Sequence, residues 1–261
     1  MTDLRDRFRA LHVSGTFVMP NPWDTGSARL LESLGFPALA TTSSGLAAAL
    51  GKLDQRVTLD ELVAHVAAVT AAVGVPLNVD AERCFDDVAA TVDALAAAGA
   101  AGISIEDYDP GAGRVETRDD AVARVAAAAS ACARHGIVLT ARAENHLYGH
   151  DDLDDTVARL RAYREAGADV LYAPGLRAPE DIARVVAAAG GPVNVLATSG
   201  APSVPELAAL GVRRVSTGGA LAWAAYGAAR TAARELLGPG TTTFRAGSLT
   251  DAEIEAAFGR G

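Results

Sequence analysis

Short apolar runs alternate with longer amphipathic, alanine-rich segments from one end of this 261-residue chain to the other. Short runs bounded by Gly, Pro and acidic residues are typical of strands buried on both faces, and the longer periodic segments are typical of helices. The predicted strands are Thr16–Pro20, Ala38–Thr42, Leu77–Glu82, Gly102–Asp107, Val138–Glu144, Asp169–Pro174, Pro192–Ala197 and Arg214–Gly218. The predicted helices are Asp24–Leu34, Leu59–Val73, Asp86–Ala98, Arg118–His135, Asp152–Ala166, Pro179–Ala189, Val204–Leu210 and Ala220–Leu237.

A helix follows every predicted strand, an order typical of parallel strands joined by crossover helices. Gly136 and Gly167 stand just past two of the helices, where a left-handed residue often ends the last turn. A final segment, Thr250–Phe258, lies outside the eight units and carries Thr250 and Glu253 at capping-box spacing.

Eight strand–helix units need about 250 residues, so the chain fits an α/β fold of the (β/α)₈ TIM-barrel type. The rival architecture, an open doubly wound sheet, usually carries G-x-G-x-x-G after its first strand. Here that stretch, Met19–Asp24, has no glycine. We therefore predict one barrel domain over residues 1–261, with short helical extensions at both ends.

Composition narrows the classes of partner. Half of the residues are hydrophobic and the net charge is -9 without any basic run, which argues against nucleic acid. Cys84 and Cys132 lie in unrelated segments and are expected to be reduced thiols. No apolar stretch approaches the roughly 18 residues of a membrane span, and the first ten residues are charged. We expect a cytoplasmic protein that acts on a small molecule.

Polar residues gather where predicted strands end, and barrel enzymes build their sites at those carboxyl ends. Asp80 and Glu82 end the third strand, Glu106 the fourth, and Arg142 the fifth. Carboxylates that converge repel one another unless a cation lies among them or one stays protonated. Oxygen ligands without a His or Cys cluster favour Mg²⁺ or Mn²⁺, and Arg142 suits a substrate carboxylate. The alternative is that these charges cap the rim and pair with each other.

Lys52 is the one lysine of the chain and lies in the loop after the second strand. A Schiff-base aldolase needs a desolvated lysine at a strand end, so that mechanism is disfavoured. A metal-stabilised enolate is the natural replacement.

Several motifs follow one another in an order known from one superfamily. They are Asn21-Pro22-Trp23-Asp24, Thr41-Thr42-Ser43-Ser44-Gly45-Leu46, Asp80-Ala81-Glu82, Ile105-Glu106-Asp107, Ala141-Arg142-Ala143-Glu144 and Pro174-Gly175. In this order and spacing the chain resembles the isocitrate lyase/phosphoenolpyruvate mutase superfamily over most of its length. The resemblance implies a Mg²⁺-dependent barrel that stabilises a pyruvate enolate while a carbon–carbon or carbon–phosphorus bond breaks or forms.

The resemblance also implies roles for individual residues. The implied metal ligands, direct or through water, are Asp54, Asp80, Glu82 and Glu106. The implied substrate-binding residues are Trp23, Ser44, Gly45, Leu46, Arg142, Asn194 and Thr198, with Ser44, Glu106 and Arg142 as the catalytic side chains. It further implies a homo-oligomer, a dimer or tetramer, in which a C-terminal helix after Ala220 is exchanged between subunits.

Two departures from the superfamily pattern shape the expected reaction. The usual Asp-x-Asp metal motif ends here in Glu82, which is one methylene longer. The lyases carry a loop with a general-acid Cys after the fourth strand, whereas Tyr108–Arg114 has no Cys, Lys or His. An isocitrate or methylisocitrate lyase is therefore disfavoured. Decarboxylation of an oxaloacetate-like acid remains, because departing CO₂ needs no protein acid.

Three alternatives stay open. Phosphoenolpyruvate mutase or phosphonopyruvate hydrolase chemistry would want further cationic groups, for which Lys52 and Arg114 are the candidates. A Cys-independent lyase would use Tyr108 or His146 as the proton donor. A non-catalytic barrel with a binding or assembly role is favoured by the lost loop and opposed by the intact acidic and Arg positions.

Overall fold

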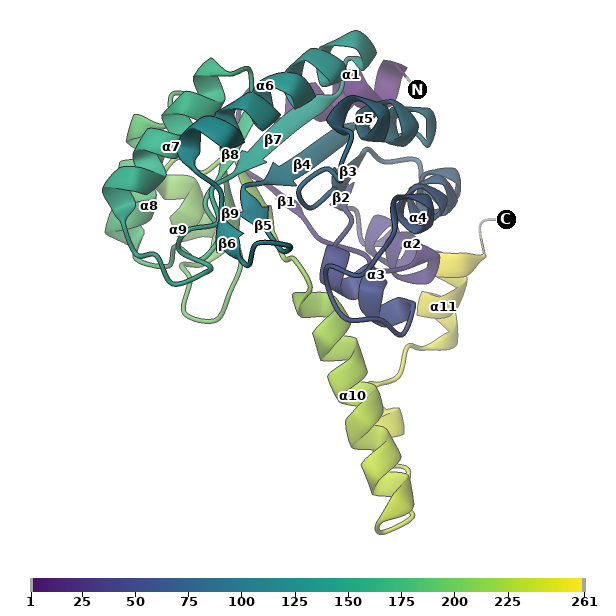
Figure 1. Ribbon diagram of the computed structural model, residues 1–261. Helices are drawn as coiled ribbons and strands as arrows, with labels where there is room; N and C mark the ends of the chain where they lie inside the picture. Colours follow the sequence, from purple (N-terminus) through teal and green to yellow (C-terminus); the bar gives the residue numbers. More distant parts are fainter. Residues whose placement is uncertain (1, 260–261) are drawn as a thin grey trace.

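The computed structural model describes residues 2–259, and eight parallel strands form its main sheet (Figure 1). The strands are β1 (Phe17–Met19), β2 (Leu39–Ala40), β3 (Leu77–Asp80), β4 (Gly102–Glu106), β7 (Val138–Arg142), β8 (Val170–Tyr172), β9 (Val193–Leu196) and β10 (Arg214–Ser216). Their order is β1-β10-β9-β8-β7-β4-β3-β2. The Ala40 amide at one end donates to the Pro20 carbonyl at the other, over 3.0 Å. This contact nearly closes the sheet, and the predicted (β/α)₈ barrel is confirmed.

Helices follow the strands, and those other than the protruding α10 cover the outside of the barrel (Figure 1). They are α2 (Thr25–Ser33), α4 (Leu59–Ala72), α5 (Val88–Ala97), α6 (Arg118–His135), α7 (Leu153–Glu165), α8 (Pro179–Ala188), α9 (Val204–Ala209) and α10 (Ala220–Leu237). Each of these strands and helices lies within its predicted range. Gly136 ends α6 with a φ of 67°, as expected for a left-handed helix end.

Elements outside the eight units were predicted less completely. The terminal helices α1 (Thr2–Leu11) and α11 (Asp251–Phe258) are the expected extensions, and Thr250 and Glu253 form the predicted capping box. A short helix, α3 (Ser43–Ala49), and a 3₁₀ turn, η1 (Thr243–Gly247), were not predicted. The segment without the lyase cysteine is a hairpin of β5 (Tyr108–Asp109) and β6 (Arg114–Val115), where a loop was expected.

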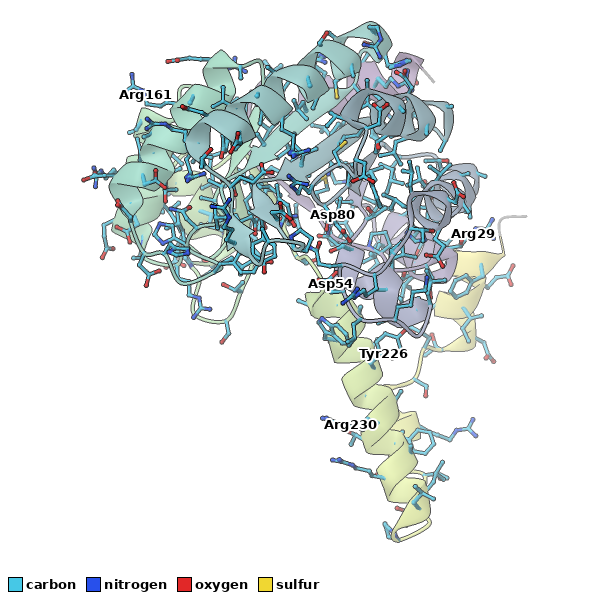
Figure 2. All side chains as sticks on the ribbon, viewed as in Figure 1. Arg29, Asp54, Asp80, Arg161, Tyr226 and Arg230 are labelled. Atoms are coloured by element: carbon cyan, nitrogen blue, oxygen red, sulfur yellow. The ribbon has the colours of Figure 1, made fainter. Side chains whose placement is uncertain are left out.

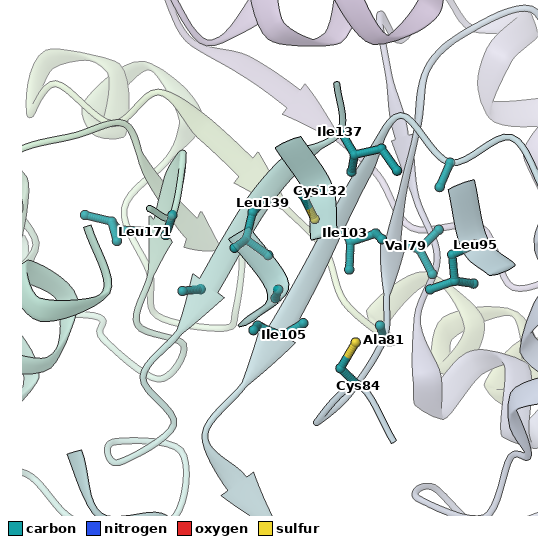
Figure 3. Packing of buried hydrophobic residues seen from close by; sticks show 14 of the residues in the cluster. Val79, Ala81, Cys84, Leu95, Ile103, Ile105, Cys132, Ile137, Leu139 and Leu171 are labelled. Atoms are coloured by element: carbon teal, nitrogen blue, oxygen red, sulfur yellow. The ribbon is translucent and has the colours of Figure 1, made fainter. Parts of the chain in front are cut away.

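Apolar side chains fill the layer between the strands and the helices (Figure 3). Val79, Ile103 and Leu139 project outward from neighbouring strands and are fully buried. The two cysteines, Cys84 and Cys132, are free thiols in this layer, and burial raises the pKa of each to about 12. They act here as small apolar groups.

A second apolar cluster closes the amino ends of the strands. Phe8 of α1 is fully buried there among residues such as Phe17 and Val138, which begin their strands. A Cβ atom on Gly102 would lie 2.4 Å from the Phe8 ring, so glycine leaves the room that the ring needs. Apolar side chains therefore plug the end of the barrel at which the strands begin.

The last long helix, α10, extends away from the barrel, and α11 returns to pack beside α2 (Figure 1). Trp223 and Leu237 on α10 are more than half exposed. The exchange of this helix between subunits stays a prediction. Among residues 2–259, no helix combines the length and apolar character needed to span a membrane.

Replacement of Phe8 by alanine is expected to lower the free energy of unfolding by about 3 to 5 kcal/mol, because it leaves a cavity in the barrel plug. Denaturant titration measures the change. Val13→Ala is the control, since Val13 is 76% exposed and should shift stability by less than about 0.5 kcal/mol. Equal effects of the two substitutions would contradict the plug.

Candidate active site

A cavity of about 190 Å³ opens at the carboxyl ends of the strands. Its lining includes Thr42, Ser43, Ser44, Asp54, Asp80, Arg142, Tyr172, Asn194, Arg214 and Ser216. Asp54 and Asp80 lie near the base of α10, at the end of the barrel from which that helix departs (Figure 2). Of the polar strand ends noted in the sequence, Asp80 and Arg142 line this cavity, whereas Glu82 and Glu106 are not among its lining residues.

Arg142, the last residue of β7, lies among three carboxylates. Its guanidinium is 3.0 Å from an oxygen of Asp80, 3.1 Å from one of Glu106 and 2.7 Å from one of Glu144. Burial alone would lower the pKa of Arg142, but these negative charges raise it above its ordinary value. The arginine is thus a fixed cation, and its charge makes so dense an acidic group tolerable.

Asp80, which ends β3, is held from two sides. One carboxylate oxygen meets Arg142, and the other accepts the backbone N–H of Ser43 at 3.1 Å. Its own amide donates to the Thr41 hydroxyl at 2.8 Å. The first turn of α3 therefore fixes the orientation of the Asp80 carboxylate.

Glu106 closes β4 and contacts a residue that sequence reasoning missed. Gln55 donates from its side-chain amide to Glu106 over 3.1 Å, while Arg142 pairs with the other oxygen. Gln55 adopts a φ of 62°, unusual for a non-glycine residue. No sequence signal marked it, because it lies in a loop without a recognisable motif.

Glu144 was part of a recognised motif but was not assigned to the site. It is fully buried, one oxygen pairs with Arg142, and the other has no partner in the described part of the chain. Burial raises the pKa of both Glu144 and Glu106, and the positive charge of Arg142 offsets part of that rise. Asp107 accepts the Glu144 backbone N–H at 2.8 Å and forms an ion pair with Arg159. Asp107 therefore positions Glu144.

Glu82 and Asp54 complete the acidic side of the site. Burial, followed by the charges of Asp80 and Asp54, raises the pKa of Glu82 to about 8. Asp54 belongs to an exposed loop, but its carboxyl end faces the cavity, where desolvation and the Asp80 charge raise its pKa. Glu82 has a φ of 48°, so the chain turns there and its side chain leaves the alternation of β3.

The predicted substrate-binding residues are not all at the cavity wall. Ser44, Arg142 and Asn194 line it. Gly45 instead packs against its neighbours, since a Cβ there would lie 2.5 Å from Thr42 and 2.9 Å from Trp23.

The remaining three lie outside the lining. Leu46 is buried in the apolar layer, and Trp23 supports the start of α3 through its contact with Gly45. The hydroxyl of Thr198 is buried without a partner in the part of the chain described. The expected substrate contacts of these three residues stay predictions, and Leu46 was expected to use its backbone N–H rather than its side chain.

The donor set suits a hard divalent cation. All of the acidic groups offer oxygen, one Glu144 oxygen is buried without a partner, and the Glu82 carboxyl is crowded by like charges. Within residues 2–259, however, no three His, Cys, Asp or Glu side chains converge as a ready ligand cluster. A cation at this place would compete with Arg142 for the same oxygens.

Comparison with known proteins identifies the family of this chain. The model of the phosphoenolpyruvate phosphomutase family matches residues 8–237, which is most of the chain. The chain belongs to this family. It is therefore an enzyme of the phosphoenolpyruvate mutase/isocitrate lyase superfamily, as the ordered motifs indicated.

Several relatives and solved structures are similar to this chain over most of its length. An oxaloacetate decarboxylase of Paraburkholderia xenovorans is 33% identical over 245 residues, 89% of this chain and 79% of the relative. A crystal structure from Burkholderia cenocepacia, provisionally described as a lyase/mutase, has 48% identity and a TM-score of 0.94, covering 98% of this chain and 96% of its own. Oxaloacetate acetylhydrolase with its product oxalate has 28% identity and a TM-score of 0.86, covering 97% and 93%.

Removal of the central cation by Arg142→Met is expected to lower the free energy of unfolding by roughly 3 to 5 kcal/mol at neutral pH, because it leaves buried carboxylates unpaired. Glu106 and Glu144 already have raised folded-state pKa values, so folding favours their protonated forms and stability falls as pH rises above their ordinary pKa. Without Arg142 their pKa values rise further. The loss should therefore be larger at pH 8 than at pH 5.5.

Urea titrations at the two pH values measure this difference between variant and wild type. Arg134→Met is the control, because Arg134 forms an ion pair with Asp93 in which both side chains are about half exposed. It should change stability by less than about 1 kcal/mol at either pH. A loss for Arg142→Met that is independent of pH would contradict the electrostatic account.

Proposed function

We propose that this enzyme is a Mg²⁺-dependent decarboxylase of oxaloacetate or a closely similar 2-oxo diacid. The observation that carries the proposal is the small cavity with acidic groups on one side and Arg142 among them. A volume of about 190 Å³ fits a small acid and little more. Relatives named oxaloacetate decarboxylase support this choice of substrate.

Asp54, Asp80, Glu82 and Glu106 are the residues that would hold the cation, and Mn²⁺ is the alternative to Mg²⁺. A bound divalent cation supplies Lewis-acid stabilisation of negative charge on the 2-oxo oxygen. Ser44 lines the cavity beside Asp80 and would donate its hydroxyl hydrogen to the substrate carboxylate. Arg142 would stabilise the charge that develops as the bond to the departing carboxylate breaks.

A pair of stacked aromatic rings follows the acidic end of β4. Tyr108 of the β5–β6 hairpin stacks on Tyr148, with ring centroids 3.6 Å apart and planes 4° from parallel. Burial and the charges of Glu106 and Glu144 raise the pKa of Tyr148. Water that enters the cavity would supply the proton that converts the enolate into pyruvate.

Phosphonate chemistry is less well supported by the cavity. The two cations that it would recruit are used elsewhere: Lys52 pairs with Glu61, and Arg114 lines a separate surface pocket with Arg83 and Arg124. The proton donors considered for a Cys-independent lyase are also poorly supported by their positions. Tyr108 is stacked on Tyr148, and His146 contacts Asp151 at 3.4 Å without lining the cavity.

The enzyme is expected to convert oxaloacetate into pyruvate and CO₂ with added Mg²⁺ and to lose this activity in EDTA. Asp80→Asn should lower kcat/KM at least about 100-fold, because it removes a charged metal ligand while keeping the side-chain shape. Pyruvate formation is measured against a blank, since free Mg²⁺ also decarboxylates oxaloacetate. Asp109→Asn on the hairpin is the matched control and should retain activity. Faster turnover of phosphonopyruvate than of oxaloacetate would contradict the proposal.

Cation binding is expected to be weak until an anionic ligand is present, because Arg142 competes for the carboxylate oxygens. Electron paramagnetic resonance with Mn²⁺ measures the bound ion, and oxalate should tighten its binding by about tenfold or more. Asp80→Asn should abolish the tight binding, whereas Asp109→Asn should leave it unchanged. An equally tight site without oxalate would show that Arg142 does not compete.

A further inference from the structure

Arg214 of β10 is a buried cation without an anionic partner. It is 1% exposed, and burial lowers its pKa to about 9. Among residues 2–259 no carboxylate pairs with it, in contrast to Arg142. Its guanidinium instead lies 2.9 Å from the Thr140 hydroxyl, 2.8 Å from the Asn194 side-chain oxygen and 3.3 Å from the His12 ring. The decarboxylation proposed above assigns no role to this residue.

An arginine can only donate hydrogen bonds, so Arg214 sets the direction of its neighbours. Asn194 must turn its oxygen toward Arg214, and its amide nitrogen then donates to the Ser216 hydroxyl at 2.9 Å. His12 must present an unprotonated Nε2, which agrees with its Nδ1 lying 2.8 Å from the Phe8 carbonyl. Arg214 thus fixes the orientation of the Asn194 amide and of the His12 ring.

This series of oriented hydrogen bonds ends at Tyr172 of β8. Ser216 accepts from Asn194, which leaves its own hydrogen for Tyr172, a residue that lines the same cavity. Donation from Ser216 to the phenol oxygen offsets part of the rise that burial causes in the pKa of Tyr172. In the sheet register Tyr172 lies between Arg142 on one neighbouring strand and Asn194 on the other. The Arg142 guanidinium also lies 5.4 Å from the centre of the Tyr172 ring.

The phenol hydrogen is left without a protein acceptor in the described part of the chain. Tyr172 is 7% exposed and lines the cavity together with Arg142 and Ser216. Because this side chain faces the cavity, its hydroxyl hydrogen is available to a ligand oxygen there. The cavity beside Arg142 is where an anionic oxygen would lie.

The geometry points to Tyr172 as a further substrate-contacting residue, whose hydroxyl donates a hydrogen bond to an anionic oxygen of the ligand, with Arg214 as the positioning residue that orients it through Asn194 and Ser216. The inference rests on the proposed function only in taking the ligand to be a small carboxylate. It needs no proton transfer.

Oxalate is the probe, because it is a small planar dicarboxylate and can be titrated calorimetrically against the full chain with Mg²⁺ present. Tyr172→Phe removes one hydroxyl and should weaken oxalate binding roughly tenfold, since the lost hydrogen bond is made to a charged group. Tyr163→Phe is the matched control. The Tyr163 hydroxyl is already bound to Asp107 at 2.5 Å, so its loss should alter stability and leave oxalate affinity within about twofold.

The positioning role of Arg214 is tested by Arg214→Met, alone and combined with Tyr172→Phe. Arg214→Met should weaken oxalate binding by roughly five- to tenfold, because Asn194 and Ser216 are then free to reverse. The double variant should be no weaker than Tyr172→Phe alone, a coupling that a merely structural role would not produce. Thermal unfolding of each variant confirms that it is folded. Additive losses would overturn the positioning step.

An oxalate affinity of Tyr172→Phe within about twofold of wild type would overturn the contact itself. Failure of the proposed function is a separate result. A wild type that binds oxalate through Tyr172 but does not decarboxylate oxaloacetate would overturn the decarboxylase and leave this contact standing. A wild type that binds no oxalate would overturn this contact, whereas the decarboxylase is judged by its turnover of oxaloacetate.

Discussion

The ionic cluster around Arg142 is the interaction on which the site depends. It joins carboxylates from β3, from β4 and from the end of β7, which are neighbours in the sheet. Without the guanidinium, so many buried acidic groups would repel one another or take up protons. The Arg142 guanidinium holds the carboxylate oxygens in place and also occupies them. The cluster therefore prepares the site for a divalent ion and at the same time competes with that ion for its ligands.

The barrel interior is layered along its axis, and each layer has its own chemistry. Charged groups surround Arg142 at the carboxyl ends, neutral hydrogen-bonding groups surround Arg214 in the middle, and aromatic and aliphatic groups surround Phe8 at the base. The two arginines therefore differ in kind. More negative than positive charge surrounds Arg142, whereas Arg214 orients the neutral hydrogen-bonding side chains around it. A ligand in the cavity would be affected by both arginines.

The sequence predicted the fold closely, because buried parallel strands and amphipathic helices leave strong periodic signals. It brought Asp80, Glu106 and Arg142 to one place for the same reason: carboxyl ends of parallel strands share one edge. It could not anticipate Gln55, whose position depends on an unusual loop conformation, or the turn at Glu82, which ends the alternation of side chains. The helix α3 was not predicted either; it directs the Leu46 side chain into the core and places Gly45 against Trp23, while the expected substrate contacts of Leu46 and Trp23 stay predictions.

Because α1 closes one end of the barrel, the cavity opens at the opposite end. Because Phe8 closes the amino ends of the strands, the opening of the cavity in residues 2–259 is the rim near Ser44 and Asp54. In the proposed cleavage, both products would leave by the path along which the next substrate arrives. The product that leaves last would occupy the cavity until it departs, so its release would form part of each turnover.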